Sequence, residues 1–295
     1  MADAQKFYLP SNDYIFKSLL FRNPEQLRQL LACLLPDMAA SLDTLRFANS
    51  ELLSLNRQGK NVRLDLNVTV GQGEIVNIEM QAINDASLAN RMQLYLARNY
   101  SGQAPADKEY VHLRRAISIW VCNFAFQDDT VCLRDYVLYD ARNGNTFPNS
   151  IRLVVLDAPK YKYAPSPVRE WLQFFSAKSE EDLMNLAATC PNMAVPCEYV
   201  RRMNMTPAER ALADAYERDL LDKALIRGSA YTEGETKGRA EGEAKGRAEG
   251  EAKGRAEGEA TRNIQIAKSM LAAGEPRAKI LQFTELSEAE LDKLL

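Results

Sequence analysis

The chain has 295 residues, of which 26% are charged and 46% are hydrophobic, and its formal net charge is -3. These values are typical of a folded globular protein and exclude a disordered or fibrous chain. A protein that holds nucleic acid by bulk charge is usually basic, so any such attraction here must be local. His112 is the only histidine. A histidine-rich zinc site and a histidine-based catalytic triad are therefore disfavoured.

The sequence lacks several features of secreted and membrane proteins. No apolar segment follows the polar residues 1–5, and the longest nearly apolar run, 116–126, is too short to span a bilayer. The five cysteines form no CxxC pair, so neither a disulfide framework nor a zinc knuckle is indicated. We expect a cytoplasmic protein without membrane contact.

The first region, 1–160, mixes helical and strand patterns. A helix starts at Asn23-Pro24-Glu25 and carries leucines at helical spacing as far as Pro36. Another helical stretch covers 87–100. Strand-like runs occupy 62–70, 75–80, 117–126, 131–139 and 151–156. This order predicts an α/β (α+β) fold with a mixed central sheet flanked by helices.

The second region, 161–228, is predicted to be a helical extension. Amphipathic helices cover 168–176 and 181–188, and Thr206-Pro207-Ala208-Glu209 is typical of a capped helix start.

The third region, 229–262, repeats the octapeptide KGRAEGEA three times. Glutamates four residues before Lys or Arg favour a helix by about 0.2–0.5 kcal/mol per pair. Glycine at every fourth position opposes it by about 0.8–1 kcal/mol each. We therefore expect a linker or a conditional helix, with a homo-oligomerisation element as the alternative.

The fourth region, 263–295, is predicted to be a small three-helix module. Its segments are 264–273, 277–283 and 288–294, with Ser287 and Glu290 forming a capping box for the last. This arrangement fits a DNA-binding helix-turn-helix. The last segment is acidic, however, which is unfavourable beside a phosphate backbone and favours a protein-contact module.

The most informative stretch is RLDLNVTVGQGEIVNIEMQ, residues 63–81. Alternation places Asp65 on the polar face of one strand and Glu79 with Gln81 on one face of the next. A three-residue loop at 71–73 pairs residues whose numbers sum to 144, so Asp65 faces Glu79. A loop of two or four residues breaks this pairing.

Two carboxylates that face each other across strands repel, and a divalent cation removes that conflict. Hard oxygen ligands suit Mg²⁺ or Mn²⁺, which polarise a phosphoryl oxygen and activate water without any histidine. Gln81 points at the same site. The alternative is a solvent-facing hairpin that happens to carry acids.

The spacing D-x(13)-E-x-Q resembles the PD-(D/E)XK nuclease superfamily in its variant with Gln in place of Lys. More specifically, the chain resembles the recombination-promoting nuclease and putative transposase family. The stretch 12–17, NDYIFK, is similar to that family's N-terminal signature, and 76–81, VNIEMQ, to its central motif. Arg91 with Tyr95 resembles the helix that follows, and such a tail repeat is common in these proteins.

This resemblance implies a restriction-endonuclease-like core and a metal-dependent DNA endonuclease that promotes recombination or accompanies mobile elements. Asp65 and Glu79 are the implied metal ligands, with Mg²⁺ or Mn²⁺ as cofactor, and Gln81 completes the catalytic set. Asp13 is either an additional acid or a helix N-cap.

The implied substrate-binding residues are Arg91, Lys17 and Arg63, although solvated arginines are the plainer interpretation of a helix such as 87–100. The expected partner is DNA, with homo-oligomerisation through the tail. The alternative function is a catalytically weak nucleic-acid-binding or assembly protein that retains the nuclease fold.

Overall fold

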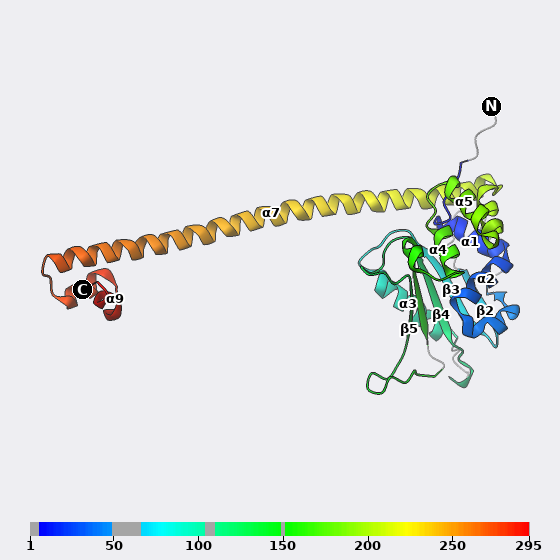
Figure 1. The fold of residues 1–295 in the computed structure, drawn as a ribbon, viewed down its shortest axis with the longest axis horizontal. Coiled ribbons are helices and arrows are strands. Elements are labelled where there is room, and N and C mark those ends of the chain that lie inside the picture. Colours follow the sequence, from blue (N-terminus) through cyan, green and yellow to red (C-terminus); the bar gives the residue numbers. More distant parts are fainter. Residues whose placement is uncertain (1–5, 49–65, 104–109, 149–150, 295) are drawn as a thin grey trace, which may run out of the picture. The chain divides into compact units, whose positions relative to one another are not determined.

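The computed structural model describes residues 6–48, 66–103, 110–148 and 151–294. The strands are β1 (Arg46–Phe47), β2 (Leu66–Val70), β3 (Glu74–Gln81), β4 (Ala116–Cys122), β5 (Leu133–Val137) and β6 (Arg152–Asp157). The α-helices are α1 (Asp13–Arg22), α2 (Pro24–Leu34), α3 (Leu88–Ser101), α4 (Val168–Phe175), α5 (Glu180–Thr189), α6 (Ala194–Arg201), α7 (Pro207–Ala272), α8 (Arg277–Thr284) and α9 (Glu288–Asp292). Short 3-10 helices are η1 (Pro36–Thr44), η2 (Tyr110–His112), η3 (Ala158–Tyr163) and η4 (Pro191–Met193). Figure 1 shows the fold, with several of the strands and α-helices labelled.

The strands form one six-stranded mixed sheet in the order β1-β2-β3-β4-β6-β5. The neighbours β3, β4 and β6 are parallel, whereas β1, β2 and β3 form an antiparallel meander and β5 runs antiparallel to β6. Helix α3 connects the parallel strands β3 and β4. The predicted α/β fold with a mixed sheet flanked by helices is confirmed.

The β2–β3 hairpin has the register that the sequence predicts. Val70 pairs with Glu74 and Leu66 with Ile78, so each pair sums to 144. The loop holds three residues, and both Gly71 and Gly73 have positive φ, which favours glycine. The sum of 144 is thus confirmed over the described part of the ladder.

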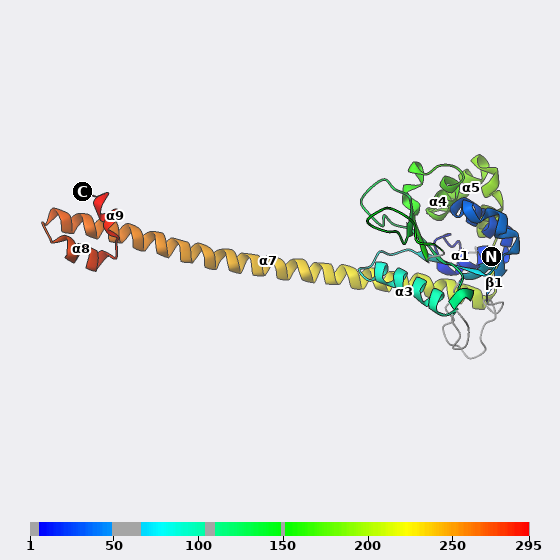
Figure 2. The same ribbon diagram turned by 90° about the horizontal axis from the view of Figure 1, so that it is seen from below.

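Apolar side chains cover both faces of the sheet. Alternate residues of β2, β3, β4 and β6 join α1, α2, α4, α5 and α6 in one large buried cluster. The opposite face carries a smaller cluster in which Leu88 and Met92 of α3 pack on Trp120 of β4. Figure 2 shows α3 and α4 on opposite sides of the sheet. The polar residues of β3 lie on the α3 face, where the apolar cover is thinner.

Helix α1 starts with a capped turn. The side chain of Asn12 accepts hydrogen bonds from the backbone N–H groups of Tyr14 and Ile15, which satisfies donors that the first turn leaves open. Asp13 is the first helical residue. The N-cap alternative for Asp13 is therefore wrong, because Asn12 fills that position.

The described chain divides into two compact units, Met1–Asp222 and Lys223–Leu295. Helix α7 begins as predicted: Glu209 N donates to Thr206 Oγ1 (3.3 Å) and Thr206 N donates to Glu209 Oε2 (2.7 Å). Helix α7 continues through the octapeptide repeat. The structure therefore has the repeat in a helical conformation, one of the two states expected for a conditional helix. Nothing lies within 4 Å of the Cβ position at the repeat glycines, so they contribute no packing in the described chain.

The second unit ends in a small helical module. Gly274, with a φ of 75°, follows the last turn of α7, and the side chain of Ser287 caps α9 in a capping box with Glu290. Its core is formed by Ala267, Ile280 and Leu291. Helices α8 and α9 cover the second and third predicted segments, whereas the first segment is the end of α7 and is continuous with the repeat.

Candidate active site

Three polar side chains, Asn77, Glu79 and Gln81, lie on one face of β3 because a strand alternates its side chains. Asn77 and Glu79 are buried, at 3% and 6% exposure. A buried carboxylate is costly unless it is paired and hydrogen-bonded. The groups that contact Glu79 therefore show how the fold accommodates a buried carboxylate.

A chain of hydrogen bonds from β4 orients one oxygen of Glu79. Trp120 Nε1 donates to Ser118 Oγ (2.8 Å), which in turn donates to Asn77 Oδ1 (3.2 Å). Asn77 Nδ2 donates to Glu79 Oε1 (3.2 Å) and to Asn67 Oδ1 on β2 (3.0 Å). The buried carboxylate is thus fixed from three adjacent strands.

The other oxygen of Glu79 faces a lysine. Lys17 Nζ lies 3.4 Å from Glu79 Oε2 and 3.0 Å from Asp13 Oδ1, and it donates to Asp13 Oδ2 (3.0 Å). The Lys17 side chain exposes only 7% of its surface, whereas Asp13 exposes 25%. Residues 13 and 17 share one side of α1 because they are one helical turn apart. Helix α1 thereby places the carboxylate of Asp13 and the ammonium of Lys17 next to the carboxylate of Glu79 on β3.

Gln81 is held by the helix that follows β3. Arg91 Nη2 donates to Gln81 Oε1 (2.7 Å) and to Asp85 Oδ2 (3.3 Å), while Gln81 Nε2 donates to the carbonyl of Met80 (3.0 Å). The Arg91 guanidinium lies 6.0 Å from the centroid of the Trp120 ring, near the limit of a cation–π contact. The neutral amide of Gln81 is therefore joined directly to a positive charge.

The structure brings together Asp13, Lys17 and Glu79, and it joins Gln81 to Arg91 on the same face of the sheet. Asp65 and Arg63 lie outside the described residues, so the predicted Asp65–Glu79 pair stays a prediction. Lys17 is buried between two acids. Its assignment as a substrate-binding residue stays a prediction too, and its ammonium is already engaged by carboxylates.

Sequence reasoning missed the roles of Asn77 and Ser118. The signal for Ser118 was present, since it is the single polar residue in the apolar strand AISIWVC, residues 116–122. Asn77 shares the face of Glu79 by simple alternation. Each was detectable as a polar residue at a buried strand position, which native proteins keep hydrogen-bonded.

The donor set fits a hard divalent cation. Glu79 and Asp13 already hold one positive group, the Lys17 ammonium, between their carboxylates, and carboxylate oxygens are the ligands that Mg²⁺ and Mn²⁺ prefer. Within the ranges that the structure describes, no group of three or more His, Cys, Asp or Glu side chains is placed to hold a metal. Asp65 is outside those ranges.

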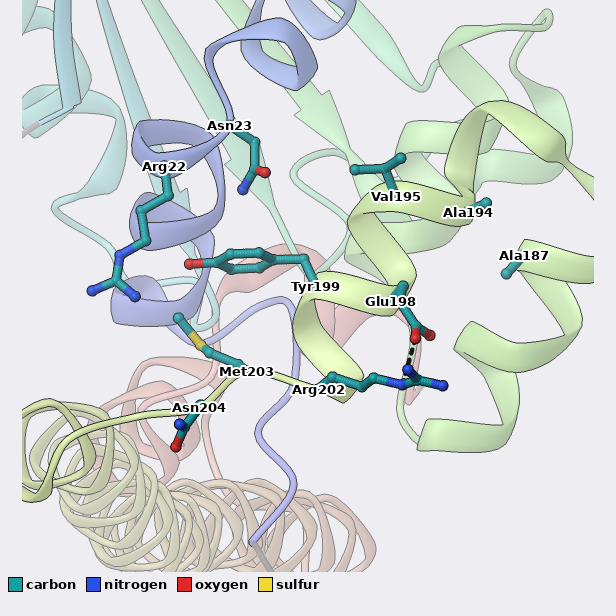
Figure 3. A pocket seen from close by; sticks show the side chains of 10 residues that line it. All are labelled: Arg22, Asn23, Ala187, Ala194, Val195, Glu198, Tyr199, Arg202, Met203 and Asn204. Carbon is teal, nitrogen blue, oxygen red and sulfur yellow. Dashed lines mark ion pairs between the residues drawn. The ribbon is translucent and has the colours of Figure 1, made fainter.

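A separate cavity of about 670 Å³ opens beside the end of α1, and its lining residues are shown in Figure 3. Arg22, Tyr199 and Met203 lie around it, but none of the site residues on β3 does. Its cations are already paired, Arg22 with Glu209 and Arg202 with Glu198. This cavity is therefore distinct from the polar site on β3.

A known family model matches the part of the chain that contains this site. Residues 10–229 match the model of the PD-(D/E)XK nuclease family transposases, a range that includes α1, the β2–β3 hairpin and α3. The chain belongs to the PD-(D/E)XK nuclease family transposases. Residues 260–295 match the C-terminal HTH domain of the Rpn/YhgA-like nuclease family. No curated protein and no solved structure matches the chain.

PD-(D/E)XK nucleases typically use divalent metal ions, which agrees with the donor set around Glu79. Membership supports a nuclease- or transposase-like function, and the C-terminal match favours the helix-turn-helix interpretation of residues 263–295. Among the residues that the structure describes, no helix is both long and apolar enough to cross a membrane.

Proposed function

We propose that the chain is a Mg²⁺- or Mn²⁺-dependent endonuclease that hydrolyses phosphodiester bonds in DNA and acts in recombination or with mobile elements. The observation that carries this proposal is the burial of Lys17 between Asp13 and Glu79. Buried charges persist where they are paired or bind metals. Two carboxylates around one positive group form a local acidic site of the kind that also attracts a divalent cation.

The proposed metal ligands are Glu79 and Asp65, with Asp13 as an additional acid. Asp65 lies outside the described residues, and its pairing with Glu79 is the one that the sum of 144 predicts from the sequence; Leu66, the next residue, pairs with Ile78. A bound divalent ion supplies a Lewis acid for the phosphoryl oxygen and an activated water. Asn77 keeps the Glu79 carboxylate oriented by donating to Oε1.

Positive charge for the phosphate comes from Arg91 and Lys17. The amide of Gln81 can neither take a proton nor carry charge, but its hydrogen bond with Arg91 aims the guanidinium at this face of the sheet. Arg91 retains 27% exposure, so it remains accessible to a phosphate oxygen. Lys17 balances the charge of Asp13 and Glu79, and its ammonium is the second cation that we assign to the scissile phosphate.

A plasmid-nicking assay tests this function. Supercoiled DNA is incubated with the wild-type chain in Mg²⁺, in Mn²⁺ and in chelator, and with the variants Asp65→Asn, Glu79→Gln and Arg91→Lys. Glu74→Gln is the matched control, because Glu74 lies at the opposite end of the same strand. We expect metal-dependent nicking that falls at least about 100-fold in Asp65→Asn and Glu79→Gln, since a metal ligand is lost.

Two further variants, Glu74→Gln and Arg91→Lys, distinguish the loss of a metal ligand from the loss of the arginine contact. Glu74→Gln is expected to cut like the wild type, and Arg91→Lys to lose part of the rate because lysine cannot make the two-sided contact with Gln81 and Asp85. Nicking that is equal in all acid variants refutes this site. DNA binding without any nicking, in either metal, favours a nucleic-acid-binding protein that retains the fold.

A further inference from the structure

Helix α1 presents two adjacent faces to different parts of the fold. The face with Asp13 and Lys17 lies against Glu79 on β3, as described above. On the neighbouring face, the Ser18 hydroxyl hydrogen-bonds with a tyrosine hydroxyl of α6 (3.2 Å), and Arg22 forms an ion pair with the first turn of α7. These partners lie 181 and 187 positions later in the sequence. Helix α1 is therefore held between the sheet and the helices that follow it much later in the chain.

Asn12 joins the first turn of α1 to α7 with both ends of its side-chain amide. Its Oδ1 accepts from the backbone N–H groups of Tyr14 (3.1 Å) and Ile15 (3.4 Å). Its Nδ2 donates to the carbonyl of Ala213 on α7 (3.0 Å). Asn12 exposes only 4% of its surface and Ala213 exposes 0%, so the loss of this donor leaves a buried carbonyl without that partner. Asp13 follows Asn12 directly, so the turn that carries this acid is bonded to α7.

The part of α7 that accepts this bond is itself anchored. Residues 207–222 belong to the same compact unit as α1 and the sheet. Lys6 Nζ and Tyr8 Oη both donate to Asp214 Oδ1, at 2.6 Å and 2.9 Å. Asp214 is the next residue after the one whose carbonyl accepts from Asn12. The acceptor therefore has a fixed position from which it can hold the start of α1.

We propose that Asn12 is a positioning residue of the candidate metal site, through which the first turns of α7 hold Asp13 and Lys17 beside Glu79. The Asp13 side chain exposes 25% of its surface, compared with 7% each for Lys17 and Glu79, so packing alone restrains it less. Groups that orient metal ligands change metal affinity by about 10–100-fold when they are lost. The role of Asn12 toward a metal rests on the proposed function, whereas its role in placing the turn does not.

Two variants isolate the bond from Asn12 to α7. Asn12→Ser keeps a side-chain oxygen that caps α1 but loses the donor to Ala213. Asn12→Asp keeps the cap and the shape and loses the same donor, and its added negative charge by itself attracts a cation. Weaker metal binding in both variants therefore reports the lost bond and not a change of charge.

Two matched controls remove one hydrogen bond each from the same region. Tyr8→Phe removes a hydroxyl that bonds α7 at Asp214. Asn23→Ser removes an amide that bonds the opposite end of α1, at the carbonyl of Leu19 (2.9 Å). The first control alters the α7 interface, and the second alters α1 far from its first turn.

Mn²⁺ binding to the full chain, measured by titration calorimetry without DNA, tests the role toward the metal. Glu79→Gln is included as the variant that loses a proposed ligand. We expect Asn12→Ser and Asn12→Asp to bind Mn²⁺ about 10-fold more weakly than the wild type, and both controls to bind within about two-fold of it.

A double-mutant cycle tests the placement of the turn without any metal. The free energies of unfolding of Asn12→Ser, Glu79→Gln and the double variant are measured by urea denaturation in chelator, beside the same cycle with Asn23→Ser. Groups that are coupled through a backbone shift give non-additive effects, and independent groups give additive ones. If Asn12 places Lys17 beside Glu79, Glu79→Gln costs less stability in the Asn12→Ser background than in the wild type. We expect this non-additivity for Asn12 and additivity for Asn23.

The outcomes separate this inference from the proposed function. An additive Asn12–Glu79 cycle overturns the placement of the turn by Asn12, whatever the metal does. Unchanged Mn²⁺ affinity in both Asn12 variants, with binding lost in Glu79→Gln, overturns the role toward the metal but leaves the proposed function standing. A wild-type chain that binds no Mn²⁺ counts against the proposed function and the metal role together, while the cycle still decides the placement.

Discussion

The Nζ atom of Lys17 lies 3.4 Å from Oε2 of Glu79, and each side chain exposes only 7% of its surface. One residue belongs to the first helix and the other to the middle of the sheet. Their contact places a positive group beside a buried acid, so that neither group lies in the interior without a partner of opposite charge.

Lys17→Met is expected to lower the free energy of unfolding by about 3–5 kcal/mol in chelator, because it leaves Glu79 buried without its cation. Mn²⁺ is then expected to stabilise this variant more than the wild type, since an ion that binds only the folded state adds stability. Thermal unfolding with and without Mn²⁺ measures both effects. Lys162→Met, at an exposed position, is the control. Equal stability of the two variants contradicts the pairing.

Ser118→Ala is expected to cost about 1–3 kcal/mol of unfolding free energy, because it removes the acceptor of Trp120 Nε1 and the donor to Asn77 within a fully buried site. The control is Ser101→Ala on α3, an exposed residue that bonds only its own helix. Urea unfolding measures the difference. If the nicking rate of Ser118→Ala falls by more than the loss of folded protein explains, Ser118 also orients Glu79 through Asn77. A Ser118→Ala chain as stable as Ser101→Ala removes the proposed chain of hydrogen bonds.

Asp157→Asn is expected to destabilise the fold by about 3 kcal/mol. Its side chain is fully buried and accepts from Phe126 N (3.0 Å), with Lys160 Nζ at 2.8 Å and Arg134 Nη1 at 3.2 Å. Removing its charge leaves two buried cations with less compensation. Asp135→Asn weakens an ion pair whose carboxylate is 42% exposed, so it is expected to cost less than Asp157→Asn. Chemical denaturation of both variants checks the contrast, and equal losses contradict it.

Stability is expected to fall as pH rises above about 9. Burial raises the pKa of the Cys122 thiol from 9.0 to about 12, with Asp157 adding to the shift, and burial raises that of Cys197 to about 12 as well. At a pH between 9.0 and about 12, each of these thiols loses its proton in the unfolded chain but keeps it in the folded chain. Raising the pH therefore favours unfolding, by about 1.4 kcal/mol per pH unit for each thiol.

Urea unfolding between pH 8 and pH 11 measures this slope in the wild type and in Cys122→Ala, where it is expected to be smaller. Cys190→Ala, at a partly exposed cysteine, is the control and is expected to keep the wild-type slope. A free energy of unfolding that stays flat across this range contradicts the prediction.

Replacing the six glycines from Gly238 to Gly258 with alanine is expected to raise the helix content of an isolated 223–262 peptide strongly. Each substitution favours the helix by about 0.8–1 kcal/mol. The ion pairs of the repeat, such as Lys237–Glu233, are about 70% exposed and contribute little. Circular dichroism of both peptides measures the change. A native peptide that is already fully helical shows that the glycine cost is offset by other interactions.

The sequence alone determined the local features of this protein. The alternation in 63–81 and the glycines of the loop define the hairpin, because side-chain period and turn geometry are local properties. The same is true of the start of α7 at Thr206 and of the capping box at Ser287. The family resemblance follows from such ordered local motifs and is confirmed.

Only the tertiary structure decided what surrounds Glu79. Nothing near residue 79 indicates that Lys17 supplies its cation, that Ser118 orients it through Asn77, or that the beginning of α7 is bonded to the turn of Asp13. These contacts join residues that are up to 201 positions apart, so no spacing rule can encode them. The partners of a buried charge are the groups that lie close to it in the folded chain. These groups come together only when the helices pack on the sheet.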